Sequence, residues 1–112
     1  MNDINHKKWY VYMIRCEDSS VYTGITTDVA RRFKEHIEGR GAKYTRNRKP
    51  VKIETVFFVG SRSEASKLEY FIKTFSKKEK ENIIFCEENR KNFIQTAENK
   101  LKIKINCENL IK

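Results

Sequence analysis

The segments WYVYMIR (residues 9–15) and VYTGI (residues 21–25) decide the fold of this chain. Both are rich in aromatic and β-branched residues, so each is predicted to be a strand. The intervening CEDSS (residues 16–20) has turn chemistry, which joins the two strands into a hairpin. Strand alternation places one set of side chains on each face of the first strand: Tyr10, Tyr12 and Ile14 on one, Trp9, Val11 and Met13 on the other.

Tyr22 and Gly24 share one face of the second strand. If the register of the hairpin matches, Tyr12 and Tyr22 lie near each other across the pair. Gly24 has no side chain, so it lets a substrate backbone or a neighbouring element approach closely.

A helix is predicted to follow the hairpin, because Asp28 suits the positive end of a helix dipole. Its apolar side is expected to hold Val29, Ala30, Phe33 and Ile37. At ~100° per residue, Arg32 and His36 lie at the edge of this side, whereas Arg31 points away. Gly39 and Gly41 are expected to end the helix.

Residues 51–59 alternate as a third strand, with one face expected to hold Val51, Ile53, Thr55, Phe57 and Val59. Ser61 and Glu64 have the spacing of a capping box that opens a second helix. The buried face of that helix is expected to hold Ala65, Leu68, Phe71, Ile72 and Phe75, and Glu69 lies at its edge, one turn before Lys73. Ser76 and Glu79 can cap a further short helix that runs through residue 85.

The predicted fold class is therefore α+β: a small three-stranded antiparallel sheet flanked by helices, in the order strand-strand-helix-strand-helix-helix. At 112 residues the chain can bury one modest core. Residues 1–85 are expected to form this domain and residues 86–112 a C-terminal extension. The alternating run at 101–105 suggests a strand in the extension, which can pack on the domain, pair with another subunit or stay partly disordered.

The charge of the chain points to a polyanionic partner. Twenty-four Lys and Arg residues oppose fifteen Asp and Glu residues, for a net charge of +9, and such a field attracts polyanions. Nucleic acid is the first expectation and an anionic membrane the second. Within residues 39–50, which contain no acid, a basic segment is the expected phosphate-binding surface: Arg40, Lys43, Tyr44, Arg46, Arg48 and Lys49.

The cysteine pattern and the hydropathy of the chain indicate the cellular compartment. Cys16, Cys86 and Cys107 are an odd, widely scattered set without a CxxC pair, so neither a disulfide framework nor a zinc site is expected. The sequence has no apolar run of the length of a membrane span, and residues 1–8 lack the apolar stretch of a secretory signal. We expect a cytoplasmic protein without a membrane partner.

Residues 6–85 resemble the GIY-YIG nuclease domain. The resemblance rests on YVY (residues 10–12), on YTG (residues 22–24), and on Arg32, His36 and Glu69 in the helices that follow. Tyr10 stands where the family name has glycine and Thr23 where it has isoleucine, as in the small stand-alone branch of the family. Many active members also carry an asparagine about twelve residues after the metal-binding glutamate. Asn82 lies close to that position, in a context that does not match.

The resemblance implies roles for five residues. Glu69 would hold a single Mg²⁺ or Mn²⁺ ion, and Arg32 would bind the scissile phosphate. Tyr12 and Tyr22 would supply the general base and its support, with Tyr12 favoured as the base. His36 would orient the tyrosine or assist proton transfer, although a half-exposed structural histidine is an equal alternative.

Each of these residues also has a purely structural reading. Glu69 has the i,i+4 spacing of a surface ion pair with Lys73, and Lys73 can instead contact phosphate. Three functions stay open. The first is a Mg²⁺-dependent endonuclease of low sequence specificity that acts on DNA rather than RNA, in repair or recombination. The second is a nucleic-acid-binding module that cuts weakly or not at all, and the third is a basic scaffold for protein partners.

Overall fold

A computed structural model of the protein describes residues 8–108. The elements follow one another in the order β1 (Trp9–Cys16), β2 (Val21–Thr26), α1 (Val29–Ile37), α2 (Lys43–Asn47), β3 (Pro50–Val59), α3 (Arg62–Lys73), α4 (Lys77–Phe85), α5 (Glu87–Leu101) and β4 (Asn106–Glu108).

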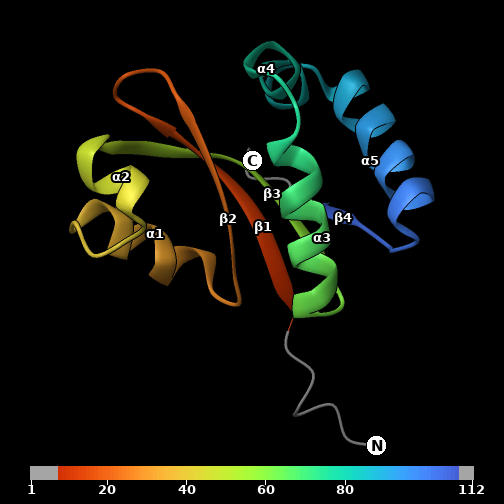
Figure 1. Ribbon diagram of the computed structural model, residues 1–112, viewed down its shortest axis with the longest axis horizontal. Coiled ribbons are helices and arrows are strands. Elements are labelled where there is room, and N and C mark those ends of the chain that lie inside the picture. Colours follow the sequence, from red (N-terminus) through yellow and green to blue (C-terminus); the bar gives the residue numbers. More distant parts are fainter. Residues whose placement is uncertain (1–7, 109–112) are drawn as a thin grey trace, which may run out of the picture.

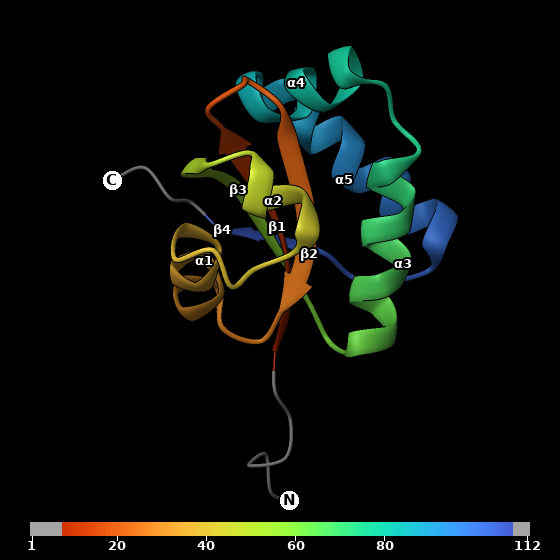
Figure 2. The ribbon, with the colours of Figure 1, turned by 60° about the vertical axis from the view of Figure 1, so that its left-hand side comes forward.

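The strands form one antiparallel sheet in the order β2-β1-β3-β4. β1 is central, and Tyr12 pairs with Gly24 of β2 on one side and with Val56 of β3 on the other. Helices α1 and α2 cover one face of the sheet, and α3, α4 and α5 lie on the opposite side (Figures 1 and 2). The predicted α+β class with an antiparallel sheet flanked by helices is confirmed.

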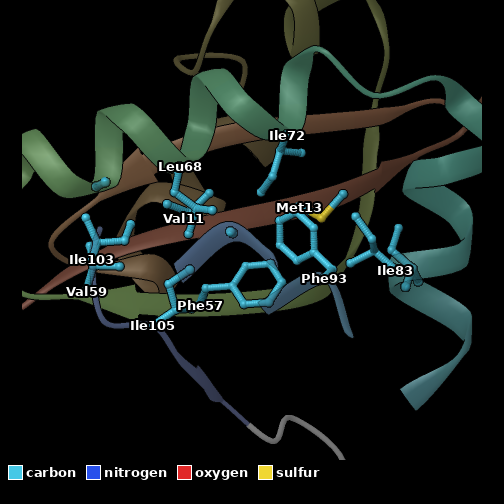
Figure 3. Packing of buried hydrophobic residues seen from close by; sticks show 13 residues of the cluster. Val11, Met13, Phe57, Val59, Leu68, Ile72, Ile83, Phe93, Ile103 and Ile105 are labelled. Carbon is cyan, nitrogen blue, oxygen red and sulfur yellow. The ribbon is translucent and has the colours of Figure 1, made fainter. Parts of the chain in front are cut away.

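Two clusters of buried side chains fill the two faces, as strand alternation requires. The larger cluster joins Val11 and Met13 of β1 to α3 and α5 through Leu68, Ile72 and Phe93 (Figure 3). The smaller cluster contains Tyr12 and Ile14 and meets α1 and α2. The predicted division of the β1 side chains between the two faces is confirmed.

The helix starts agree with their predicted caps. The Asp28 carboxylate accepts a hydrogen bond from the Arg31 amide, and the Ser76 and Glu79 side chains form a full capping box. Ser61 caps α3 by accepting from the Glu64 amide. The Glu64 carboxylate, however, accepts from the Gly60 amide, so the predicted box at α3 is only half formed.

The expectation that alternate residues of 51–59 share one face is wrong in the first half of the strand. Met13 pairs with Thr55 but Ile14 pairs with Ile53, which leaves Glu54 as an extra residue on β3. Such a bulge shifts the alternation by one residue. Ile53 therefore packs with the Tyr12 cluster, while Val51 is exposed.

The expected apolar side of α1 is also partly wrong. Val29 and Phe33 pack on the Tyr12 cluster, but Ala30 and Ile37 are exposed. The buried residue of the helix is His36. α1 is therefore rotated so that its polar edge, which carries the candidate site residues, faces the sheet.

The C-terminal segment packs on the domain. α5 buries Phe93 and Ala97, and the C-cap residue after it, Lys102, has a left-handed backbone with a φ of 60°. The strand expected at 101–105 is wrong: Ile103 and Ile105 enter the larger cluster without ladder pairing, and β4 follows them and pairs with β3. The sheet thus gains a fourth strand beyond the three predicted, and α2 is a further addition to the predicted order, formed inside the basic segment.

No helix within residues 8–108 has the length and apolar composition to cross a membrane.

Candidate active site

Two tyrosines meet across the β1–β2 pair. The ring centroids of Tyr12 and Tyr22 are 6.2 Å apart, and Tyr12 pairs with Gly24 while Tyr22 pairs with Ile14. This is the proximity expected if the register of the hairpin matches. Gly24 makes this possible, because a Cβ atom there would lie 2.6 Å from the Tyr12 hydroxyl oxygen and 2.9 Å from Cε2 of Tyr22. The close approach predicted at Gly24 is made by the side chains of Tyr12 and Tyr22.

His36 of α1 lies directly against this pair. Its Nε2 atom is 2.9 Å from the Tyr12 hydroxyl oxygen, and its Nδ1 atom is 2.7 Å from Oγ1 of Thr45 in α2. The histidine is only 1% exposed, so it is not the half-exposed residue considered above. A Cβ at Gly41 would come within 2.2 Å of Nδ1, so that glycine lets the chain pass over the imidazole.

Burial keeps both partners neutral. Tyr12 is 1% exposed, and this burial, with the nearby Tyr22 second, raises the pKa of its phenol above the ordinary value. Burial, and then the charge of Arg32, lowers the pKa of His36 to about 4. At neutral pH the Tyr12 phenol is therefore protonated and the His36 imidazole is uncharged.

Arg32 reaches the same place from α1. Its guanidinium lowers the pKa of both tyrosines, although burial outweighs this effect. Its Nη1 atom donates to Glu35 over 2.8 Å, and Glu35 also accepts from Arg31 over 2.9 Å. Glu35 thus holds the candidate phosphate-binding arginine, a role that the sequence reading missed.

Glu69 and Lys73 approach from α3, on the other side of the edge strand β2 (Figure 2). The Lys73 ammonium donates to Glu69 over 3.0 Å and lies 6.0 Å from the centre of the Tyr22 ring. The pKa of Tyr22 is raised mainly by burial, with Lys73 opposing this and Glu69 adding to it. The site therefore wraps around the β2 edge, with α1 on one side and α3 on the other.

The donors suit a metal ion with a mostly water-filled shell. Residues 8–108 contain no group of three or more His, Cys, Asp or Glu side chains that could hold a metal. Mg²⁺ is commonly bound through one or two carboxylates, with water and phosphate oxygens completing its shell. The partly exposed Glu69 carboxylate beside Tyr22 fits that mode, and a cage made of protein ligands alone does not.

The basic segment is continuous with the site through contacting aromatic rings. The ring centroids of Tyr44 of α2 and Tyr22 are 5.7 Å apart in a tilted arrangement, and the Arg48 guanidinium lies 4.2 Å from the centre of the Tyr44 ring. Arg48 also pairs with Asp18 of the hairpin turn over 3.0 Å. The remaining cations of the segment are exposed: Arg40, which pairs with Glu38, and Lys43, Arg46 and Lys49.

Asn82 lies away from this cluster. Together with Phe75 and Phe93 it lines a shallow pocket of about 230 Å³ between α4 and α5. It therefore does not join the groups at the β2 edge.

The sequence that carries these residues matches a described protein family. The GIY-YIG catalytic domain family matches residues 8–82, more than half of the chain, and the chain belongs to this nuclease-type family. Within it the chain groups with the UPF0213 proteins. It is 52% identical to a UPF0213 protein of Fusobacterium nucleatum subsp. nucleatum over 97 residues, which cover 87% of this chain and 94% of that protein.

A UPF0213 protein of Cupriavidus necator is 51% identical over 78 residues, covering 70% of this chain and 83% of that protein. Among solved structures, the solution NMR structure of a UPF0213 protein from Bacillus halodurans is similar, with 42% identity, a TM-score of 0.46, and coverage of 74% of this chain and 93% of that one.

Proposed function

We propose that this protein is a Mg²⁺-dependent endonuclease that hydrolyses phosphodiester bonds in structured or single-stranded DNA with little sequence preference. One observation carries the proposal: Tyr12, Tyr22, Arg32, His36 and Glu69, which come from four elements, gather around the β2 edge. A cytoplasmic role in repair or recombination is part of the same proposal.

Tyr12 and His36 are the proposed proton-accepting pair. The attacking water gives a proton to the Tyr12 oxygen while Tyr12 passes its own proton to Nε2 of His36, along the 2.9 Å hydrogen bond between them. The resulting hydroxide attacks phosphorus, and His36 becomes imidazolium. Because Tyr12 is 1% exposed in the free protein, this step requires neighbouring side chains to admit a water when substrate binds.

Arg32 and Glu69 serve the phosphate in this proposal. The Arg32 guanidinium, held by Glu35, binds the scissile phosphate and stabilises the charge that develops on it. Glu69 would hold the Mg²⁺ ion, which when bound supplies charge neutralisation and stabilisation of the leaving oxygen. Lys73, which pairs with Glu69 in the free protein, is then available to contact phosphate.

DNA is proposed to follow the contacting rings of Tyr22 and Tyr44 from the site to α2. Exposed Lys43 and Arg46 would contact backbone phosphates, and Tyr44, next to Tyr22, continues the path. The net charge of +9 supports this reading.

A second function is favoured by the ion pair of Glu69. Its carboxylate is already bonded to Lys73 over 3.0 Å, and the phenol of Tyr12 is buried and protonated. Both features suit a nucleic-acid-binding module that cuts weakly or not at all.

Cleavage of branched, single-stranded and duplex DNA, with and without Mg²⁺, tests the two functions. We expect Glu69→Gln to bind DNA as the wild type does but to lose cleavage, whereas Glu88→Gln, at an exposed position of α5, keeps it. Unchanged cleavage by Glu69→Gln would refute the metal assignment. Binding without cleavage by the wild type would establish the module instead.

A further inference from the structure

Thr45 links the basic segment to the buried histidine. It is 2% exposed, and its Oγ1 atom lies 2.7 Å from Nδ1 of His36. The same oxygen lies 3.0 Å from the carbonyl oxygen of Ala42, one turn earlier in the chain. No feature of the sequence pattern marks this threonine, because it lies within a run of cations.

The partners of Thr45 determine where the imidazole proton lies. A carbonyl oxygen only accepts, so the threonine hydroxyl donates to Ala42. The Thr45 oxygen can then accept a hydrogen bond, and the N–H group at Nδ1 of His36 donates it. Nε2 consequently carries the lone pair, and the Tyr12 hydroxyl donates to it. All four groups are satisfied by this one arrangement of protons.

The reverse tautomer makes fewer hydrogen bonds. A proton on Nε2 would face the Tyr12 hydroxyl and compete with its proton. Nδ1 would then have to accept from the Thr45 hydroxyl, which would give up its hydrogen bond to the Ala42 carbonyl, although that carbonyl keeps the bonds from the Thr45 and Arg46 amides. A buried donor that loses its acceptor destabilises the arrangement. The tautomer with a proton on Nδ1, which keeps an acceptor for both hydroxyl groups, is therefore preferred.

We propose that Thr45 is a positioning residue that fixes His36 as the Nδ1-protonated tautomer, so that Nε2 is kept free to receive the proton of Tyr12. The role in turnover rests on the proposed nuclease function, but the tautomer itself does not. The effect is comparable to that of a carboxylate or carbonyl that orients a catalytic histidine in other sites.

The charged and titratable neighbours of the histidine are Tyr12 on β1, Tyr22 on β2, and Arg32 and Glu35 on α1. From α2 the imidazole is contacted by Thr45, which does not titrate, and the Tyr44 ring of that helix lies against Tyr22. Arg32 and Glu35 act on the imidazole with opposite signs. Neither selects between the two ring nitrogens by a hydrogen bond, which leaves Thr45 and Tyr12 to do so.

Long-range ¹H–¹⁵N NMR of the imidazole tests the tautomer directly. The chain has two histidines, so the spectrum of His36→Gln assigns the signals. We expect a protonated Nδ1 and an unprotonated Nε2 in the wild type and in Thr45→Ser, which keeps the hydroxyl. The nearly isosteric Thr45→Val should lose this preference. A wild-type Nε2–H tautomer overturns the proposal without any variant.

Single-turnover cleavage by the same proteins tests the positioning role. Thr45→Val should cut about 10-fold more slowly or worse, with unchanged DNA affinity, and Thr45→Ser should restore the rate. A shifted tautomer with a wild-type rate overturns the positioning role. If the wild type does not cleave DNA at all, the nuclease function fails while the NMR result still decides the tautomer.

Discussion

The Tyr12 hydroxyl group packs against Gly24 so closely that a Cβ atom on Gly24 would lie 2.6 Å from the hydroxyl oxygen. The tyrosine pair therefore depends on a missing side chain on the partner strand. Because the Tyr12 hydroxyl also forms a hydrogen bond with His36, this contact sets the position of both members of the proposed proton-accepting pair.

Gly24→Ala should disturb both stability and activity. The added methyl group meets Tyr12 and Tyr22 at less than contact distance and overpacks the cluster, which we expect to cost about 1–3 kcal/mol in the free energy of unfolding. Displaced tyrosines should lower cleavage on the order of 100-fold. Urea unfolding and single-turnover cleavage measure the two effects. Gly60→Ala is the control, because its Cβ meets only the flexible Glu64 carboxylate.

His36 should make stability depend on pH. An unfolded histidine titrates near 6.5, whereas burial lowers the pKa of His36 to about 4. Between these values the unfolded chain binds the extra proton, so the free energy of unfolding should fall by up to about 3 kcal/mol as the pH drops from 6.5 to 4. His36→Gln should flatten this dependence. An equally steep fall in the variant would contradict the burial of a neutral imidazole.

A second pH window belongs to the ion pair that ties the hairpin to α4. Arg15 donates to both carboxylate oxygens of Glu81 over 2.6 Å, and this lowers the pKa of Glu81 to about 2. The stabilisation is complete above the ordinary carboxylate value of 4.5 and should be lost as the pH falls from there toward 2.

Glu81→Gln should therefore be less stable than the wild type at pH 7, by about 1–2 kcal/mol, and the difference should shrink below pH 3. Denaturant unfolding at several pH values measures it. Glu17→Gln, at an exposed position of the hairpin turn, should show no such difference. A gap between Glu81→Gln and the wild type that persists unchanged at pH 2.5 would mean that the charge of Glu81 is not what stabilises the fold.

The cations of α2 should contribute to DNA affinity through phosphate contacts. The double variant Lys43→Ala, Arg46→Ala should bind more weakly, and the slope of log affinity against log salt should become shallower by about 2. Fluorescence anisotropy over a salt series measures the slope. Lys91→Ala, Lys100→Ala on α5 removes the same charge, and a matching loss there would mean that net charge alone drives binding.

The sequence was sufficient for the elements whose signals are local. Alternation placed Tyr12 and Tyr22 on one face, and helical spacing separated Arg32 from Arg31. The caps at Asp28 and Ser76 carried their usual signatures. These features depend on neighbours within a few residues, which pattern reading captures.

The remaining differences arise from contacts between distant segments. His36 is buried because Thr45 of α2 and Gly41 of the segment before α2 cover it, and the periodicity of α1 does not predict that cover. The sequence pattern did not single out Glu35, whose contacts with Arg31 and Arg32 are seen only in the folded helix. Glu54 is an extra residue in β3 because of the register between β3 and β1, which strand alternation alone does not predict.

The proton-accepting role of Tyr12 is tested most directly by the single-turnover cleavage rate of Tyr12→Phe beside that of Tyr10→Phe. Both variants remove one hydroxyl from the same strand, but only Tyr12 is bonded to His36. We expect the Tyr12 variant to cut about 100-fold more slowly or worse at unchanged DNA affinity, while the Tyr10 variant keeps the wild-type rate. A Tyr12→Phe protein that cuts as fast as the wild type would contradict the account.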